Sequence, residues 1–188
     1  MKKIALFGTS ADPPTAGHQA ILRWLSEHYD WVAVWASDNP FKGPQTPLEH
    51  RTKMLRLMIE ELDLPGNNIS LHEELSDRRS LIAVEKAREI WGKDADFTLV
   101  IGSDLVSQIR HWYRVEELLE KVQVLIVPRP GYPIEDEELE ALRCLGGTLT
   151  SADFNAPAVS STAYRQHRDE SAVTQPVADY IHREKLYA

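Results

Sequence analysis

Two stretches far apart in the chain contain residue types that bind phosphate groups. The first, GTSADPPTAGH from Gly8 to His18, follows a short apolar run and precedes a helical pattern. A loop between the carboxyl end of a parallel strand and the amino end of a helix offers free N–H groups and partial positive charge. Glycines allow the backbone to approach a phosphate closely, and His18 is placed to donate to an anionic oxygen. The stretch therefore predicts an anion-binding loop.

This first stretch lacks the spacing of two other phosphate-binding loops. It contains neither the dinucleotide pattern G-x-G-x-x-G nor a Walker pattern ending in Gly-Lys-Ser/Thr. Hydride transfer and P-loop hydrolysis are therefore disfavoured. A purely structural interpretation stays open, in which the stretch is a turn and His18 is an ordinary histidine at a helix start.

The second stretch is S-S-T-A-Y-R, residues 160–165. Ser and Thr are common N-caps, so one interpretation is capping alone, worth about 1 kcal/mol of helix stability. Arg165 lies three residues beyond Thr162 and returns to the same helical face, beside the hydroxyl groups and the free N–H groups. The stretch therefore predicts a second anion site.

Composition limits the classes of protein that fit. The chain has 188 residues, 21 Lys+Arg against 29 Asp+Glu, a formal net charge of −8, and one cysteine, Cys144. A single cysteine excludes an internal disulfide and a multi-cysteine zinc site, and it favours a reducing, cytoplasmic compartment. The acidic balance disfavours nucleic-acid binding, which requires Lys and Arg to neutralise phosphates. The opening apolar run is too short for a signal-peptide core or a membrane span, so no membrane partner is expected.

The elements that must position the two stretches follow one another regularly. Short apolar runs alternate with longer segments of helical period, which predicts parallel strands joined by crossover helices. The expected strands are residues 3–7, 31–36, 69–72, 97–101, 122–127 and 148–150. The expected helices are residues 48–62, 80–91, 115–121, 135–145 and 173–186, with one more after each phosphate-binding stretch. The predicted fold class is α/β with a doubly wound parallel sheet. Residues 1–188 are expected to form one domain, whose helical segment at about 160–188 carries the second site.

The two stretches carry a family resemblance. T-A-G-H at residues 15–18 resembles the T/H-x-G-H motif of the nucleotidyltransferase superfamily. The wider stretch resembles the GGTFDPxHxGH form of bacterial nicotinate mononucleotide adenylyltransferases, although S-A at 10–11 partly replaces Thr-Phe and Thr15 stands for a histidine. V-S-S-T-A-Y-R at 159–165 is similar to the I-S-S-T-x-x-R element that holds the ATP triphosphate in that superfamily. The resemblance extends over nearly the whole chain and implies a Rossmann-like nucleotidyltransferase fold.

The resemblance implies roles for residues at several positions. His18 and Arg165 would be catalytic, as donors that stabilise charge on the phosphates. The residues implied in ATP binding are Gly8, Thr9, Thr15, Gly17, His18, Gly102, Asp104, Ser161, Thr162 and Arg165. The residues implied in binding the acceptor nucleotide are Ser10, Asp12, Lys42, Ser80, Trp112 and Arg129. No protein ligand to a metal is expected.

Several of these residues also have an ordinary structural interpretation. L-V-I-G-S-D at 99–104 resembles the family's I-I-G-x-D, in which Asp104 would accept from ribose hydroxyls, but Asp104 is also a candidate N-cap. Trp112 would stack on the pyridine ring, worth about 0.5 to 2 kcal/mol for a cationic ring, or would pack in the core. Lys42 resembles a family lysine, although exposed lysines are mostly solvated charges. R-P-G-Y-P at 129–133 resembles the family run in which Arg129 reaches the nucleotide.

The resemblance also implies a reaction. An adenylyltransferase of this kind joins ATP to nicotinate mononucleotide and releases nicotinate adenine dinucleotide and pyrophosphate. Direct in-line attack without a covalent intermediate is expected, with Mg²⁺ held through the substrate phosphates. The family's P-S-Y-T stretch is missing at residues 77–82, where only Ser80 matches and Arg78 and Arg79 are alternative partners for the nicotinate carboxylate.

Alternatives to this reaction stay open at the level of sequence. The acceptor is either nicotinate mononucleotide, nicotinamide mononucleotide or both, because the stretch at 77–82 departs from the family. A phosphopantetheine adenylyltransferase and a non-catalytic nucleotide sensor would contain the same two phosphate-binding stretches. The oligomeric state, including a homo-oligomer, is likewise not fixed by the pattern of apolar residues.

Overall fold

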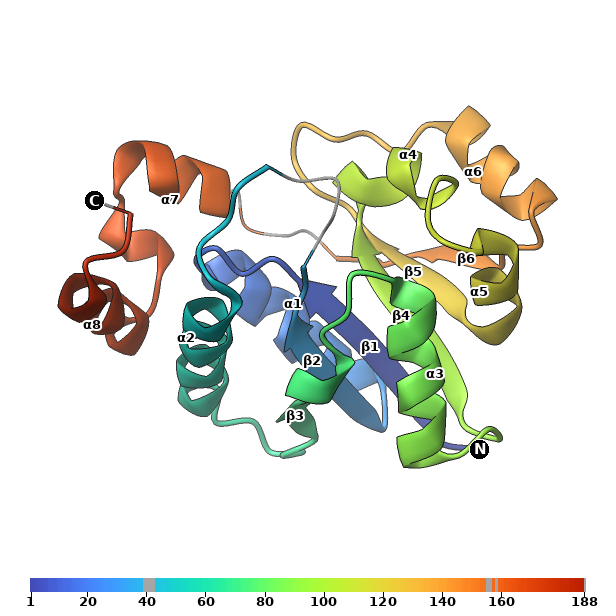
Figure 1. Ribbon diagram of the computed structural model, residues 1–188, viewed down its shortest axis with the longest axis horizontal. Helices are drawn as coiled ribbons and strands as arrows, with labels where there is room; N and C mark the ends of the chain where they lie inside the picture. Colours follow the sequence, from blue (N-terminus) through green and yellow to red (C-terminus); the bar gives the residue numbers. More distant parts are fainter. Residues whose placement is uncertain (39–42, 155–156, 158, 188) are drawn as a thin grey trace.

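A six-stranded parallel sheet forms the centre of the protein, and its strands follow the order β3-β2-β1-β4-β5-β6 (Figure 1). The computed structural model describes residues 1–38, 43–154, 157 and 159–187. The strands are β1 (Lys3–Thr9), β2 (Trp31–Ala36), β3 (Ile69–Leu71), β4 (Asp96–Gly102), β5 (Gln123–Val127) and β6 (Leu149–Ser151). All six predicted strands are confirmed, with ends that differ from the predicted ones by two residues or fewer.

Helices cover both faces of the sheet, as a doubly wound fold requires. On one face they are α1 (Ala16–His28), α2 (Leu48–Glu61), α7 (Ser161–His167) and α8 (Gln175–Glu184). On the other face they are α3 (Ser80–Trp91), α4 (Val106–Ile109), α5 (Val115–Lys121) and α6 (Asp136–Cys144). Three 3₁₀ turns complete the structure, namely η1 (Glu73–Leu75), η2 (Ser103–Leu105) and η3 (Glu170–Ala172). These turns and α4 were not expected, because such short elements leave no periodic apolar pattern.

The two covered faces explain why the strands are continuously apolar. In β1, Ala5 and Phe7 belong to the core beneath α1 and α2, whereas Ile4 and Leu6 belong to the core beneath α3 and α5. All four side chains are buried, because successive residues of a strand point to opposite faces. The unbroken apolar runs in the sequence therefore predicted the correct kind of sheet.

The helices after β6 pack at one side of the molecule. Figure 1 shows α8 beside α2, while α4, α5 and α6 lie at the opposite side. Tyr164 of α7 and Val177, Tyr180 and Ile181 of α8 are buried in the same core as α1 and α2. The helices after β6 therefore pack on the same face of the sheet as α1 and α2. In the part of the chain that the structure describes, no helix is both long and apolar enough to cross a membrane.

Candidate functional site

The strand order reverses between β1 and β4, and this is the place where a sheet of this kind binds ligands. Strands 3-2-1 run outward to one side and strands 4-5-6 to the other, which leaves a crevice beyond the carboxyl ends of β1 and β4. Gly8 and Thr9 end β1, and Gly102 ends β4. The predicted ATP-binding residues of these two strands therefore lie at the topological switch point.

The two glycines at these strand ends are required by close neighbours. A Cβ atom at Gly8 would lie 2.6 Å from the indole of Trp35 in β2. A Cβ atom at Gly102 would overlap the carboxylate of Asp104 and lie 3.0 Å from Cδ of Arg129. Larger residues at either position would displace side chains at the end of the sheet.

The start of α1 presents His18 through a capping box. Thr15, 2% exposed, is the N-cap, and its hydroxyl accepts from the N–H of Gly17 at 3.2 Å. The N–H of Thr15 in turn donates to Nδ1 of His18 at 2.9 Å. Because Nδ1 accepts, the hydrogen of the neutral imidazole is on Nε2. The cap therefore fixes both the orientation of the ring and the nitrogen that can donate.

The second predicted anion site packs directly against the first. The hydroxyl of Ser161 donates to the carbonyl of Pro13 at 2.7 Å, and Nη1 of Arg165 donates to the carbonyl of Asp12 at 2.6 Å. A Cβ atom at Gly17 would lie 3.3 Å from the carbonyl oxygen of Val159. Two stretches separated by about 150 residues of sequence thus form one surface at the amino ends of α1 and α7.

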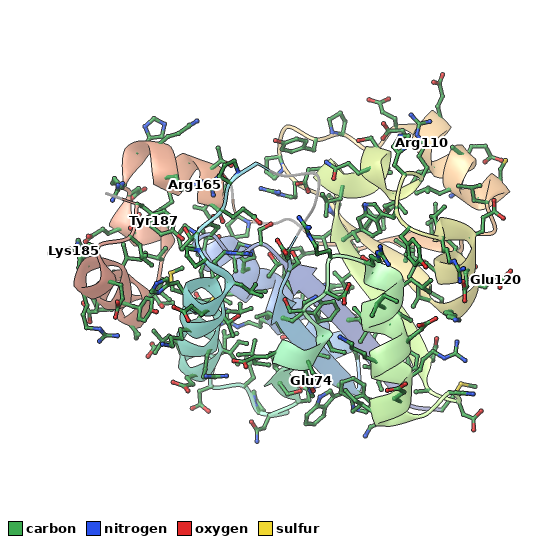
Figure 2. All side chains as sticks on the ribbon, in the orientation of Figure 1. Glu74, Arg110, Glu120, Arg165, Lys185 and Tyr187 are labelled. Carbon is green, nitrogen blue, oxygen red and sulfur yellow. The ribbon has the colours of Figure 1, made fainter. Side chains whose placement is uncertain are left out.

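Arg165 reaches this surface from α7 (Figure 2). Its Nη2 also lies 3.3 Å from the hydroxyl of Thr162, as expected for residues three apart on a helix. Ser160 is the N-cap of α7 and accepts from the N–H of Ala163 at 3.0 Å. The sequence prediction that Ser160 caps the helix is confirmed.

A buried arginine donates hydrogen bonds to the backbone of the loop after β1 and of two neighbouring segments. Arg51 of α2 is 2% exposed and donates to the carbonyls of Ser10, Ser37 and Thr46 at 3.0, 2.6 and 2.7 Å. Burial lowers the pKa of Arg51, and the negative charge of Asp12 opposes that effect. In the sequence Arg51 stands at the polar start of the apolar stripe of this helix, and that pattern indicates neither its burial nor its partners.

The carboxylate of Asp12 is also held from the far end of the chain. Asp12 is 4% exposed; its Oδ1 accepts from the hydroxyl of Tyr187 at 2.5 Å and its Oδ2 from the N–H of Thr46 at 3.2 Å. Burial, and then the hydrogen bond to Asp12, raise the pKa of Tyr187 well above its usual value. The sequence shows Leu186-Tyr187 as a pair that resembles the family's closing L-Y, but it gives Tyr187 no role, since no local pattern links it to Asp12.

An ion pair lies at the end of β4. Nη1 of Arg129 is 2.9 Å from Oδ2 of Asp104, and the N–H of Arg129 donates to the hydroxyl of Ser103 at 2.8 Å. Gly102, not Asp104, is the N-cap of η2, and it has no side chain to cap with. Asp104, which is predicted to contact ATP, and Arg129, which is predicted to contact the acceptor nucleotide, therefore form an ion pair with each other.

Among the predicted acceptor residues, Ser80, Trp112 and Arg129 are less buried than Asp12. Trp112 is half-buried and packs against the core on the α3 side of the sheet, and Ser80 is the first residue of α3. The guanidinium of Arg79, just before α3, lies 4.4 Å from the ring centroid of Tyr113. Nε of Arg78 is 3.4 Å from a carboxylate oxygen of Asp38.

The remaining predicted residues are Thr9, Ser10 and Lys42. Lys42 lies outside the described residues. The carbonyl of Thr9 accepts from the N–H of Ser37, and the carbonyl of Ser10 accepts from Arg51. Roles of all these side chains toward substrates stay predictions.

A metal ion held by the protein would need several His, Cys, Asp or Glu side chains close together. Within 1–38, 43–154, 157 and 159–187, no group of three or more His, Cys, Asp or Glu side chains is arranged to hold a metal ion. The carboxylates nearest the switch point, Asp12 and Asp104, bind Tyr187 and Arg129. These residues do not form a ligand set for Mg²⁺.

Comparisons with known proteins agree with this geometry. Residues 6–167 match the model of the cytidylyltransferase-like family. The chain is 48% identical to a probable nicotinate-nucleotide adenylyltransferase of Synechocystis sp., a match that covers 98% of each chain. It is 33% identical to a probable nicotinate-nucleotide adenylyltransferase of Bacteroides thetaiotaomicron, covering 89% of this chain and 82% of the relative.

Solved structures show the same fold. The nicotinic acid mononucleotide adenylyltransferase of Plasmodium falciparum complexed with NaAD matches with a TM-score of 0.83 at 20% identity, covering 100% of this chain and 98% of that one. A putative nicotinate-nucleotide adenylyltransferase of Vibrio parahaemolyticus matches with a TM-score of 0.67 at 25% identity, covering 100% and 96%. The expected Rossmann-like nucleotidyltransferase fold is confirmed.

Proposed function

Since the chain is a nicotinate-nucleotide adenylyltransferase of the cytidylyltransferase-like family, we propose that it joins its two substrates by direct in-line attack. An oxygen of the mononucleotide phosphate attacks the α-phosphorus of ATP and forms a new P–O bond. The bond from that phosphorus to the oxygen bridging toward the β-phosphate breaks, and pyrophosphate leaves with the electron pair. The attacking phosphate is already ionised at neutral pH, so no general base is needed.

The observation that carries this proposal is the placement of His18 and Arg165 on one surface. Both side chains come from the amino ends of helices that contact the loop at 10–15, one through the Thr15 cap and the other through the carbonyl of Asp12. Helix amino ends and fixed donors stabilise charge on a transferring phosphoryl group. We assign Nε2 of His18 to the α-phosphate and the guanidinium of Arg165 to the departing pyrophosphate.

No side chain is needed as a covalent nucleophile. Cys144 is exposed at the end of α6, on the face of the sheet opposite α1 and α7. Positioning and charge stabilisation therefore supply the catalysis. Mg²⁺ enters the proposal only as an ion carried by the phosphates of ATP, since the described carboxylates do not form a site for it.

Arg79 is our candidate for recognition of the nicotinate carboxylate. Of the two arginines in the stretch that departs from the family, Arg78 is paired with Asp38, whereas Arg79 lies over Tyr113, next to Trp112. Tyr113 follows Trp112, the residue proposed to stack on the pyridine ring, and a cation close to that ring would favour an acid over an amide on it. Nicotinate mononucleotide is thus the preferred acceptor.

The setting of the reaction is also part of the proposal. Residues 1–188 act as a single domain on small-molecule substrates, without nucleic-acid or membrane partners, in the cytoplasm. The acidic composition and the single cysteine support this setting.

The test is a set of parallel assays with three acceptors. Pyrophosphate release from ATP is measured with nicotinate mononucleotide, nicotinamide mononucleotide and phosphopantetheine, and the dinucleotide product is identified by mass. We expect turnover with nicotinate mononucleotide to exceed turnover with either other acceptor. ATP binding without turnover would identify a nucleotide sensor and reject the proposal, and preference for another acceptor would reject the assignment of the pyridine pocket.

A further inference from the structure

The ATP-binding loop is connected to the segment that follows α8 by a cluster of three polar residues. The hydroxyl of Tyr187 donates to Oδ1 of Asp12 at 2.5 Å, and the N–H of Thr46 donates to Oδ2 at 3.2 Å. Tyr187 and Thr46 therefore each hold one carboxylate oxygen of Asp12, and we call these three residues the tail latch.

The latch lies where a lost hydrogen bond has a large effect. Asp12 is 4% exposed, so its carboxylate cannot exchange a protein partner for bulk water. Burial and the hydrogen bond to Asp12 both raise the pKa of Tyr187, so the phenol remains protonated and donates throughout the neutral range. The hydroxyl of Tyr187 is thus the donor to a buried carboxyl group.

Asp12 connects the latch to the proposed catalytic donors. Its carbonyl accepts from Nη1 of Arg165 at 2.6 Å, while its side chain accepts from Tyr187. Three residues further on, Thr15 holds Nδ1 of His18. A shift of Asp12 would therefore move the contact of Arg165 and the loop that leads into the His18 cap.

The ring of Tyr187 contacts α7, the helix that carries Arg165. It packs edge to face on Tyr164, with 5.9 Å between ring centroids, and Tyr164 directly precedes Arg165 in α7. Figure 2 shows Arg165 and Tyr187 on the same side of the molecule, one from α7 and the other from the segment after α8. The ring fixes the helix that carries Arg165, and the hydroxyl fixes the loop to which Arg165 bonds.

We propose that Tyr187 is a positioning residue for adenylyl transfer, acting through Asp12 on the placement of Arg165 and His18. The inference rests on the proposed function, because it assigns Tyr187 to the geometry of that reaction. It concerns the hydroxyl specifically, since phenylalanine would keep the packing on Tyr164. The tail of the chain is thereby part of the support of the ATP site.

The experiment compares Tyr187→Phe with a matched control, Tyr180→Phe. Tyr180 of α8 also makes one hydroxyl hydrogen bond, to Nδ1 of His50 in α2 at 2.7 Å, and has no hydrogen bond to the loop at 10–15 among those of the described residues. Steady-state kinetics with ATP and nicotinate mononucleotide are measured at 25 °C, and thermal melting establishes that each variant is folded. For Tyr187→Phe we expect a lower kcat and a higher KM for ATP, together about tenfold to 100-fold in kcat/KM, because misplacement of reacting groups has effects of that order.

The pattern of the kinetic changes separates positioning from stability. A variant that is only less stable would contain less active enzyme, which lowers the apparent kcat and leaves both KM values unchanged. Tyr180→Phe should retain wild-type KM for ATP and kcat. An unchanged KM for ATP and kcat in folded Tyr187→Phe, or an equal loss in Tyr180→Phe, would overturn the inference. Absence of turnover in the unaltered protein would instead reject the proposed function.

A double-mutant cycle tests whether Tyr187 acts through Asp12. Asp12→Ala and Tyr187→Phe are measured singly and together, with kcat/KM for ATP as the readout. We expect the double variant to be no worse than Asp12→Ala within about twofold, because the hydroxyl then has no carboxylate to hold. Multiplicative losses would show independent roles and contradict the proposal. Should Asp12→Ala fail to fold, the comparison of Tyr187→Phe with Tyr180→Phe decides.

Discussion

The two halves of the candidate site are built in different ways. On the triphosphate side, which we define as the loop at 10–15 and the amino ends of α1 and α7, the supporting charges are buried: Arg51 is 2% exposed and Asp12 is 4% exposed. On the acceptor side, which we define as residues 77–80, 112–113 and 129–132, the charged side chains are less buried, and the most buried pair there, Arg129 with Asp104, is 34% and 17% exposed. The pair Arg78–Asp38, for example, has side chains 69% and 46% exposed.

The difference has an energetic meaning. Buried polar groups that lose a partner destabilise a fold strongly, so they fix one geometry before substrate arrives. Exposed ion pairs contribute about 0 to 1 kcal/mol and exchange partners readily with water or ligand. The chemistry of adenylyl transfer is thus placed on the rigidly supported half, and recognition of the acceptor on the half whose contacts can be exchanged. Substitutions on the two sides should therefore differ in kind as well as in size.

The largest effect should follow from removal of the donor on the triphosphate side. His18→Ala should lower kcat by about 100-fold to 1000-fold, the usual loss when one aligned donor to developing charge is removed. The measurement is single-turnover formation of the dinucleotide with saturating substrates. His28→Ala, at the other end of α1, is the control, because the described interactions of His28, a hydrogen bond to the carbonyl of Trp24 and stacking on the Trp24 ring, both stay within α1.

Two outcomes would count against this assignment. Near-normal adenylyl transfer by folded His18→Ala would remove His18 from the mechanism. An equal loss in His28→Ala would show that α1 as a whole is sensitive and that the imidazole at residue 18 has no special role.

A smaller effect, and one on binding, is expected at Arg165. Arg165→Ala should raise KM for ATP by about tenfold to 100-fold, the range for loss of a hydrogen bond to a charged group, and should change KM for nicotinate mononucleotide little. Initial rates over a matrix of both substrate concentrations measure the two constants. Arg183→Ala in α8 removes the same charge from a side chain that is 67% exposed and serves as the control. A rise in KM for the acceptor alone would show that Arg165 binds the acceptor and not ATP.

The sequence predicted the two sides unequally, for physical reasons. Apolar runs predicted all six strands, and the helical pattern after His18 predicted α1, because these signals depend on neighbours along the chain. The contact between Tyr187 and Asp12 spans 175 residues and leaves no local pattern. Nor could the pairing of Asp104 with Arg129 be predicted, since only the sheet brings the ends of β4 and β5 together.

The smallest effect should be found on the acceptor side, at Arg79. Its guanidinium lies over the exposed ring of Tyr113, a contact that a substrate can displace at little cost. Arg79→Ala should raise KM for nicotinate mononucleotide by about threefold to fivefold, the scale of an exposed ion pair, while KM for nicotinamide mononucleotide stays the same.

Arg78→Ala removes an equal charge one residue earlier and is the matched control, because that guanidinium is paired with Asp38. The ratio of the two KM values is the quantity to measure, since it separates loss of a contact to the carboxylate from a general weakening of acceptor binding. A selectivity ratio unchanged in Arg79→Ala would leave the nicotinate carboxylate without an arginine partner. A shift in Arg78→Ala alone would move that partner by one residue. A loss as large as that of Arg165→Ala would show that the acceptor side is as rigidly built as the triphosphate side, and would remove the contrast between them.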